Sequence, residues 1–309
     1  MIVCVLGGSG FVGTELVIRL VHAGYWVRVP TRSIRRVDRL RVLDTAELRV
    51  ANVHDARVLS QLFCGCDAVI NLIGILNSRG PASFEAVHTT LAAKVMAAAR
   101  AAGVRHLLHM SALGADEHGP SRYLRSKGAA ETQLRAALPA DAAQPHLAVT
   151  IFRPSVIFGP QDSLTNRFAS LLRLGGGWLP LARAGARFAP VCVFDVAEAF
   201  VRALGTSASH GATYELCGPE VMTLEQIVRR TAHVARLSCY IVPLPDFIAR
   251  LQGVVMGLLP GKPFSLDNFR SLTVDSVCRR DGCAALGIVP APMLAVLPQY
   301  LAPSASRVA

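Results

Sequence analysis

The sequence lacks several features that would place it in common functional classes. Only 17% of its 309 residues are charged, and no run of five or more lysines and arginines occurs, although the formal net charge is +11. Because no aromatic residues interleave with such a run either, nucleic-acid binding is not expected. The positive charge fits attraction to a phosphorylated cofactor or to an anionic membrane surface better.

Signals for export, membrane insertion and metal binding are also missing. No stretch reaches the roughly 18 apolar residues that a membrane-spanning helix needs. The chain starts with neither a basic n-region nor an Arg-rich presequence, so we expect a cytoplasmic protein, with a peripheral position on the inner face of the membrane as the alternative. None of the eight cysteines forms a CxxC pair, so we predict no metal site, and we expect Cys64 and Cys66 to be buried, reduced thiols.

The order of apolar runs and helical patterns predicts an α/β fold. Apolar residues make up 52% of the chain, enough for a large core. We predict strands over 2–6, 26–30, 48–50, 68–73, 104–110 and 148–152. We predict helices over 12–23, 55–63, 83–102, 123–138, 166–174, 195–204, 223–236 and 245–259. The alternation favours a doubly wound parallel sheet of the Rossmann type over 1–153, then remaining core elements and a smaller substrate or partner lobe over 154–303, with a tail at 304–309.

A glycine turn follows the first predicted strand. Gly7, Gly10 and Gly13 stand in a GxxGxxG spacing between that strand and an amphipathic helix. Glycine allows a tight turn, a close approach of backbone N–H groups to a diphosphate, and close packing of helix on strand. The strand before, the helix after and the next strand at the right distance therefore predict a dinucleotide site.

The residues after the second predicted strand favour NADP(H) over NAD(H). NAD sites usually place a carboxylate there to bind the ribose hydroxyls, but no acidic residue occurs between Glu15 and Asp38. Thr31 and Arg32 occupy this position, with Arg35 and Arg36 beyond them. A guanidinium suits a 2′-phosphate through paired, charge-assisted hydrogen bonds. For Arg35 and Arg36 a solvated surface position is an equal alternative.

Further residues are expected along the cofactor's path. Asn52 and Asp55 follow the third strand, where the adenine would lie, although Asp55 equally suits a helix cap. Asn71 and Gly74 end the fourth strand. The complete set of predicted cofactor contacts is Gly7, Ser9, Gly10, Phe11, Val12, Gly13, Thr31, Arg32, Asn52, Val53, Leu72, Ile73, Gly74, Tyr123, Lys127 and Pro154.

Three residues are candidates for catalysis. Tyr123 and Lys127 lie four apart on a predicted helix, which puts both on one face. A nearby ammonium favours the phenolate and lowers the pKa of tyrosine toward a useful range. Ser111 ends the preceding strand, where a hydroxyl could hold a substrate carbonyl oxygen. The alternative is an ordinary surface pair on a helix.

These motifs together resemble a known family. GxxGxxG, a Ser-ended strand and YxxxK resemble the short-chain dehydrogenase/reductase superfamily, and "FRPSVIFGPQD" (152–162) looks like a segment of its extended, epimerase-like branch. The stretches "SRYLRSKGAAE" and "FEAVH" look most like the Rossmann-fold accessory subunit of respiratory complex I and its bacterial relatives. The resemblance covers about residues 1–240. It implies tightly bound NADPH, without a need for redox turnover, near quinone enzymes or the membrane.

One position departs from the catalytic members of this family. The resemblance implies an asparagine in the long helix before the Ser-bearing strand, where it supports a proton relay to the lysine. His88 stands there instead, and Ser111 can lie a residue or two from the usual hydroxyl position. His88 could take a proton itself, but a hydrogen-bonded core histidine is the favoured interpretation.

The second lobe carries two further candidates. Asp195 is interpreted as a helix N-cap, with a polar group facing the cleft as the alternative. One apolar helical stripe is formed by Phe247, Ile248, Leu251, Val254, Val255, Leu258 and Leu259. A helix packed on the core is the first interpretation of 246–259, and an amphipathic helix on a membrane or partner, or a wall of a substrate pocket, are the alternatives.

Three functions follow from these observations. The leading hypothesis is an NADP(H)-binding protein with an accessory or weakly catalytic role, associated with a quinone-related enzyme or complex. Its chief rival is an active NADP-dependent reductase or epimerase/dehydratase that uses Tyr123 as acid/base, Lys127 as its activator and Ser111 as support for the oxyanion. The third is a cofactor sensor or scaffold without catalysis.

Overall fold

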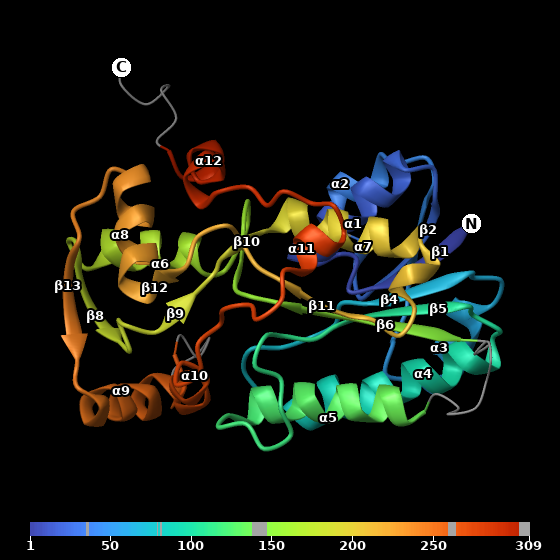
Figure 1. Ribbon diagram of the computed structural model, residues 1–309, viewed down its shortest axis with the longest axis horizontal. Helices are drawn as coiled ribbons and strands as arrows, with labels where there is room; N and C mark the ends of the chain where they lie inside the picture. The colour runs from blue at the N-terminus through green and yellow to red at the C-terminus, as the bar shows by residue number, and fades with distance from the viewer. Residues whose placement is uncertain (35–36, 79, 81, 138–146, 259–263, 303–309) are drawn as a thin grey trace.

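A seven-stranded parallel sheet forms the centre of the molecule (Figure 1). The computed structural model describes residues 1–34, 37–78, 80, 82–137, 147–258 and 264–302. The sheet order is β11 (Thr213–Leu216), β6 (Ala148–Pro154), β5 (His106–Met110), β4 (Ala68–Asn71), β1 (Ile2–Leu6), β2 (Trp26–Thr31) and β3 (Ala46–Val50). The chain reverses its direction of travel across the sheet after β3, so the carboxyl ends of β1 and β4 flank the point where ligands of such folds bind.

Helices cover both faces of this sheet. One face carries α1 (Phe11–His22) and α7 (Val193–Leu204), with the short α2 (Asp38–Arg41) beside them. The other carries α3 (Ala56–Phe63), a π-helical segment (Glu85–Thr90), α4 (Leu91–Ala101) and α5 (Arg122–Ala136). Neighbouring strand residues alternate between two buried clusters, because successive side chains point to opposite faces: Val5 belongs to one and Leu6 to the other.

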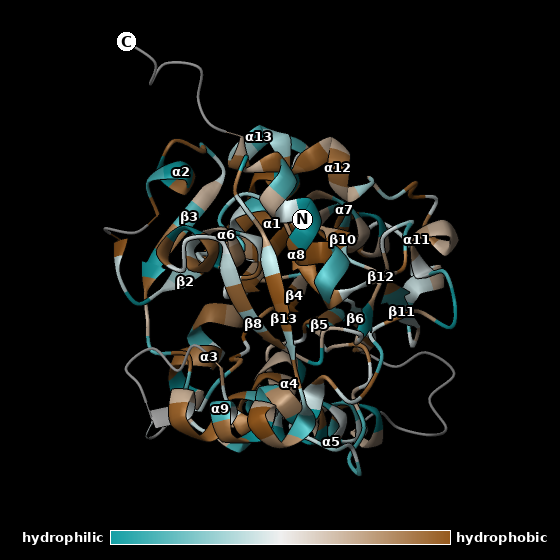
Figure 2. Cartoon of the chain, turned by 90° about the vertical axis from the view of Figure 1, so that its left-hand side faces the viewer, coloured by the Kyte–Doolittle hydropathy of each residue, from teal (hydrophilic) through white to brown (hydrophobic). Residues whose placement is uncertain are grey.

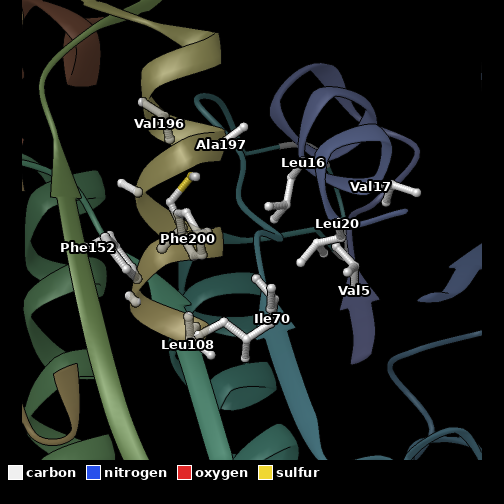
Figure 3. Packing of buried hydrophobic residues seen from close by; sticks show 14 of the residues in the cluster. Val5, Leu16, Val17, Leu20, Ile70, Leu108, Phe152, Val196, Ala197 and Phe200 are labelled. Atoms are coloured by element: carbon white, nitrogen blue, oxygen red, sulfur yellow. The ribbon is translucent and has the colours of Figure 1, made fainter. Parts of the chain in front are cut away.

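The core between α1, α7 and the sheet contains tightly packed large side chains (Figure 3). Phe152 of β6 and Phe200 of α7 stack with ring centroids 4.0 Å apart, and both are fully buried. Leu16 and Leu20 of α1 face the same space. Truncating a buried phenylalanine in such a core costs about 3–5 kcal/mol, so this packing fixes α1, and with it the glycine turn.

A smaller lobe lies beyond the carboxyl ends of the strands, at the left of Figure 1. It contains three two-stranded ribbons, β10–β7, β12–β9 and β13–β8, and the helices α6, α8, α9 and α10. Their bounds are β7 Ile157–Phe158, α6 Thr165–Leu174, β8 Trp178–Ala182, β9 Arg187–Phe188, β10 Val191–Cys192, β12 Met222–Thr223, α8 Leu224–Val234, β13 Tyr240–Leu244, α9 Asp246–Leu258 and α10 Leu266–Ser271. A 3-10 turn (Ser207–Ser209) precedes β11, and α11 (Gly282–Ala285), α12 (Met293–Val296) and α13 (Pro298–Leu301) end the described chain.

The predicted doubly wound fold is confirmed, with local corrections. Thr223 and Gln226 form the expected capping box at α8. Asp195 does not cap a helix: Cys192 is the N-cap of α7, and the Asp195 carboxylate accepts the backbone N–H of Ala291 at 2.8 Å. The tail at 304–309 lies outside the described residues.

The cysteines also differ from expectation. Cys66 is buried but Cys64 is exposed, and both are free. A disulfide joins Cys217, just after β11, to Cys278, which the scattered spacing gave no reason to pair. Within the described ranges, no helix has the length and apolar content needed to cross a bilayer.

Candidate functional site

The glycine turn leaves backbone donors free at the start of α1. Gly7 has a φ of +80°, which a side chain would strain, and a Cβ on Gly13 would lie 2.2 Å from the carbonyl oxygen of Gly7. Gly10 is the N-cap of α1, and no side chain caps that end. Because the first N–H groups of a helix have no partner within it, those of Phe11, Val12 and Gly13 can bind an anion. The turn therefore fits a dinucleotide diphosphate.

A cleft of about 1590 Å³ begins at this turn and runs into the second lobe. Asp55 and Asn71, which were also expected along the cofactor's path, are not part of its lining. The lining does include the complete set of predicted cofactor contacts and Ser111: Gly7, Ser9, Gly10, Phe11, Val12, Gly13, Thr31, Arg32, Asn52, Val53, Leu72, Ile73, Gly74, Ser111, Tyr123, Lys127 and Pro154. The lining within the described residues holds no Asp or Glu, whereas it includes Arg32, Lys127 and Arg167. The electrostatic environment therefore favours a negatively charged ligand.

The end of the cleft beside the loops after β2 and β3 contains Arg32 and Asn52. Arg32 is exposed and forms no ion pair with any described residue, so its guanidinium is available to a phosphate. The Asn52 side chain accepts the backbone N–H of His54 at 3.1 Å, which shapes the loop after β3. Asp55 does not line the cleft; it caps α3 by accepting the backbone N–H of Arg57 at 2.8 Å. Arg35 and Arg36 lie outside the described residues.

Tyr123 and Lys127 lie one turn apart near the start of α5. Lys127 is buried, and its Nζ donates to the carbonyl oxygen of Met110 at 2.8 Å. Burial lowers the pKa of Lys127 to about 8, which the nearby charge of Glu131 partly opposes. Burial also raises the pKa of Tyr123 to about 12. The expected lowering of the tyrosine pKa is therefore absent, because burial would remove the hydration of the phenolate.

Ser111 lies directly after β5. Its backbone N–H donates to the carbonyl oxygen of Phe152 at 2.7 Å, while its Oγ is buried without a hydrogen-bond partner among the described residues. A buried hydroxyl without a partner is uncommon and points to a group that arrives with a ligand. Since Ser111 lines the cleft, its Oγ can donate to a ligand oxygen.

His88 lies in the core behind the cleft, within the π-helical segment. Its Nε2 accepts the backbone N–H of Ile75 at 2.9 Å, so the proton of the neutral ring is on Nδ1. Nδ1 donates to Ser126 Oγ at 2.8 Å, and that hydroxyl donates to the carbonyl oxygen of Tyr123. Burial, together with the charges of Lys127 and His109, lowers the pKa of His88 to about 2. The ring is therefore neutral, with both nitrogens bonded.

Two residues that hold the loop 72–74 differ from the sequence prediction: one was expected to contact the cofactor, and the other was not predicted at all. Asn71, expected beside the cofactor, is buried: its Oδ1 accepts the backbone N–H of Ile73 at 3.2 Å, and its Nδ2 lies 3.3 Å from His109 Nδ1. The pair holds the loop 72–74 against the cleft. His109 gave no sequence signal beyond an isolated histidine in an apolar strand. Arg167, in the second lobe, was also missed.

The comparisons with known proteins agree with this geometry. A family model described as NAD(P)H-binding matches residues 7–168. The chain belongs to this NAD(P)H-binding family. It is 31% identical over 293 residues to the mitochondrial NADH dehydrogenase [ubiquinone] 1 alpha subcomplex subunit 9 of Arabidopsis thaliana, covering 90% of this chain and 71% of the relative. It is 30% identical over 245 residues to a ceramide reductase of Caulobacter vibrioides, covering 79% and 74%.

Solved structures share the fold of this chain. A nucleoside-diphosphate-sugar epimerase from Staphylococcus aureus superposes with a TM-score of 0.77 at 14% identity, covering 96% of this chain and 100% of that one. A UDP-glucose 4-epimerase from Thermotoga maritima gives 0.75 at 18% identity, covering 97% of each chain. At these identities the likeness concerns the fold alone.

Proposed function

We propose that this protein holds NADP(H) in the cleft and has an accessory or weakly catalytic role in quinone or respiratory metabolism. The observation that carries the proposal is the state of His88. A dinucleotide cleft with a Tyr-Lys pair is present, but the residue behind the lysine has both ring nitrogens in hydrogen bonds and a pKa of about 2. A ring that stays neutral and is bonded at both nitrogens is a poor acceptor of a further proton, so we expect slow turnover.

The cofactor is bound by three parts of the chain. The N–H groups at the start of α1 hold the diphosphate, Arg32 binds the 2′-phosphate that distinguishes NADP(H), and Tyr123 and Lys127 hold the nicotinamide ribose. Buried Lys127 is well suited to bonding with ribose hydroxyls, since its Nζ already has one short bond to Met110 and is shielded from water. When bound, NADPH supplies a hydride for the reduction of a carbonyl.

The rival activity is catalysis by the same residues. The Tyr123 phenol is protonated through the neutral range, as a proton donor to a developing alkoxide requires, but its raised pKa makes it a weaker acid than a free tyrosine. Ser111 Oγ, without a protein partner, can donate to the carbonyl oxygen. These features favour a working reductase for a single proton transfer. The working reductase thus differs from the accessory or weakly catalytic protein in how fast Tyr123 regains its proton after each turnover.

The bound nucleotide and a pair of variants test both functions. We expect NADPH to copurify with the protein or to bind more tightly than NADH in calorimetry. A rapid-mixing measurement with a carbonyl or quinone substrate then compares the first turnover with the steady state. His88→Asn restores a side chain that can hold a relayed water, so we expect faster steady-state turnover with an unchanged Kd for NADPH. Fast turnover by the unaltered protein, lost in Tyr123→Phe, would establish the rival instead.

We place the protein at the cytoplasmic face of a membrane. The support is α9, whose apolar stripe faces outward: Phe247, Leu251 and Val255 are 73%, 63% and 54% exposed. The adjoining ribbon β8–β13 adds Trp178 and Tyr240, with ring centroids 5.2 Å apart, and Figure 2 faces this side of the molecule. Exposed apolar and aromatic side chains on a basic protein fit the interface of an anionic bilayer. The mitochondrial relatives are named as subunits of a ubiquinone-reducing complex, which supports a partner in quinone metabolism.

A further inference from the structure

The half of the cleft that lies in the second lobe is bounded by one face of α6. Arg167, Phe168, Leu171 and Leu174 line it, together with Leu164 just before the helix. These positions are three or four residues apart and so share one helical face. The face is apolar except for Arg167, which lies in the first turn.

The opposite walls are mixed. β8 contributes the apolar Trp178, Leu179 and Leu181, and α9 contributes Met256, while polar groups enter the lining from Gln252 of α9 and from Asn268 and Ser271 of α10. At the C-terminal end of α6 the wall opens to solvent, because Leu174 is 86% and Trp178 is 61% exposed. From Arg167 to Leu174 the face extends about 10 Å, at 1.5 Å per helical residue. We call this part of the cleft the channel: its walls are mostly apolar, it contains one cation, and it opens to solvent at Leu174 and Trp178.

Arg167 has no function in the cofactor site described above. Its side chain is half-buried, and it forms no hydrogen bond or ion pair with any described residue. Burial lowers its pKa, yet a guanidinium stays charged at any physiological pH. A partly desolvated cation with no carboxylate in the surrounding lining is costly unless an anion joins it.

We propose that this channel binds an amphiphile with an anionic head group and a single hydrocarbon tail. Arg167 holds the head group, and the tail lies along Phe168, Leu171 and Leu174 toward the mouth. The assignment rests on the proposed function only in that both use one cleft. The amphiphile is then also the class of substrate that we propose for the cleft. Its head group would lie between the channel and the end of the cleft that contains Ser111 and Tyr123.

Tryptophan fluorescence can follow binding at the mouth of the channel. The chain has two tryptophans, so Trp26→Phe leaves Trp178 as the reporter. The probes are dodecanoate, dodecyl phosphate and neutral dodecanol, which share one tail. We expect both anions to shift the Trp178 emission to the blue and to bind about tenfold more tightly than dodecanol, as a charge-assisted bond to Arg167 requires. The affinities of dodecanoate and dodecyl phosphate, compared with each other, show whether a carboxylate or a phosphate head group is preferred.

Variants on α6 separate head-group from tail contacts. Arg167→Leu should weaken both anions about tenfold and dodecanol less than twofold, whereas Arg167→Lys should restore part of the anion preference. Arg173→Leu is the matched control: it removes a charge from the exposed face of the same helix and should change neither. Leu171→Gln should weaken all three probes. Equal affinity for the anions and dodecanol, or anion binding that Arg167→Leu leaves intact, would overturn the proposal.

NADPH affinity, measured separately by calorimetry, distinguishes this proposal from the proposed function. We expect Arg167→Leu to leave it within twofold. If NADPH fails to bind but the amphiphiles bind as described, the cofactor assignment is wrong and the channel assignment stands. If Arg167→Leu instead weakens NADPH and spares dodecanoate, Arg167 belongs to the cofactor and the channel proposal fails.

Discussion

Burial, rather than neighbouring charge, determines the protonation of the titratable side chains around the cleft. It lowers the pKa of Lys127, His88 and His109 and raises that of Tyr123. In each case the neutral form gains, because the charged form loses its hydration. At the Tyr123–Lys127 end of the cleft, His88, His109 and Tyr123 therefore do not titrate near pH 7, whereas Lys127, with a pKa of about 8, does. This is the residue-level reason for expecting slow turnover.

Buried histidines also make stability depend on pH. The pKa values of His88, His106 and His109 fall to about 2, 4 and 3. Between these values and 6.5 the unfolded chain binds more protons, so the free energy of unfolding rises with pH and is lost as pH falls below 6.5. Each histidine should remove about 1 kcal/mol between pH 7.5 and 5.5. Urea unfolding of the whole chain at the two pH values measures this loss.

A matched pair of variants assigns that pH dependence. His109→Asn should lower stability at both pH values but reduce the difference between them by about 1 kcal/mol. His118→Asn, at an exposed position, should leave the difference unchanged. An undiminished pH difference in His109→Asn would show that this histidine can gain its proton without unfolding.

Cofactor preference can be tested at Arg32. Arg32→Asp places a carboxylate where NAD sites have one and removes the guanidinium that suits a 2′-phosphate. We expect NADPH affinity to fall at least tenfold and NADH affinity to hold or rise, measured by calorimetry. Arg19→Asp would disturb an ion pair with Glu198 and is unsuitable, whereas Arg173→Asp, away from the cleft, is a fair control. Equal losses for both nucleotides in Arg32→Asp would refute selection of NADP(H) by this residue.

At the scale of elements, the sequence predicts the first half of the fold better than the second. Long periodic runs give β1, α1, β2 and α3 within a few residues of their bounds, because each buries a continuous apolar face. The ribbons of the second lobe escaped prediction. β7, β9, β10 and β12 are two residues long, too short for any period to appear, and they exist only through partners distant in sequence.

The residues of the candidate site also fall into those that the sequence predicts and those that it does not. Glycine spacing and YxxxK are local patterns, so their residues could be predicted, and they line one cleft. The interpretation of His88 as a hydrogen-bonded core histidine is confirmed, but its partners could not be predicted, since Ile75 and Ser126 lie in other parts of the chain. Arg167 was missed because nothing in a single helical turn distinguishes an unpaired arginine from a solvated one. The stripe of 246–259 was visible, but only the structure turns it outward; Leu259 lies outside the described residues.

The proposed membrane contact is assigned to α9 as an element. The double variant Leu251→Asp and Val255→Asp places two charges on its exposed stripe, where folding is little affected because both side chains already face solvent. We expect flotation with liposomes containing anionic lipid to be largely lost. Val289→Asp, at a 92% exposed valine far along the chain, is the matched control and should float like the unaltered protein. Undiminished flotation of the double variant would exclude α9 as the contact.

On the scale of the whole molecule, the segment between α10 and α11 returns from the second lobe to the edge of the main sheet (Figure 1). The Glu215 carboxylate of β11 accepts the backbone N–H groups of Arg279 and Arg280, at 2.6 and 3.1 Å. Ser155, which lines the cleft, donates its hydroxyl to the carbonyl oxygen of Ser276 at 2.7 Å. The Cys217–Cys278 disulfide lies between these contacts and links this segment to the chain just after β11.

This disulfide predicts a dependence of stability on redox conditions. It spans 61 residues, and the loss of unfolded-chain entropy for such a loop corresponds to about 4 kcal/mol at most. Cys278→Ser should therefore unfold at lower urea than the unaltered protein in oxidising buffer, by about 2–4 kcal/mol. In reductant the two should converge, because both then lack the bond. Cys64→Ser, at an exposed free cysteine, should match the unaltered protein in both buffers. If Cys278→Ser is equally stable without reductant, the two sulfurs are not bonded in solution, and the hydrogen bonds of Glu215 and Ser155 alone hold this segment.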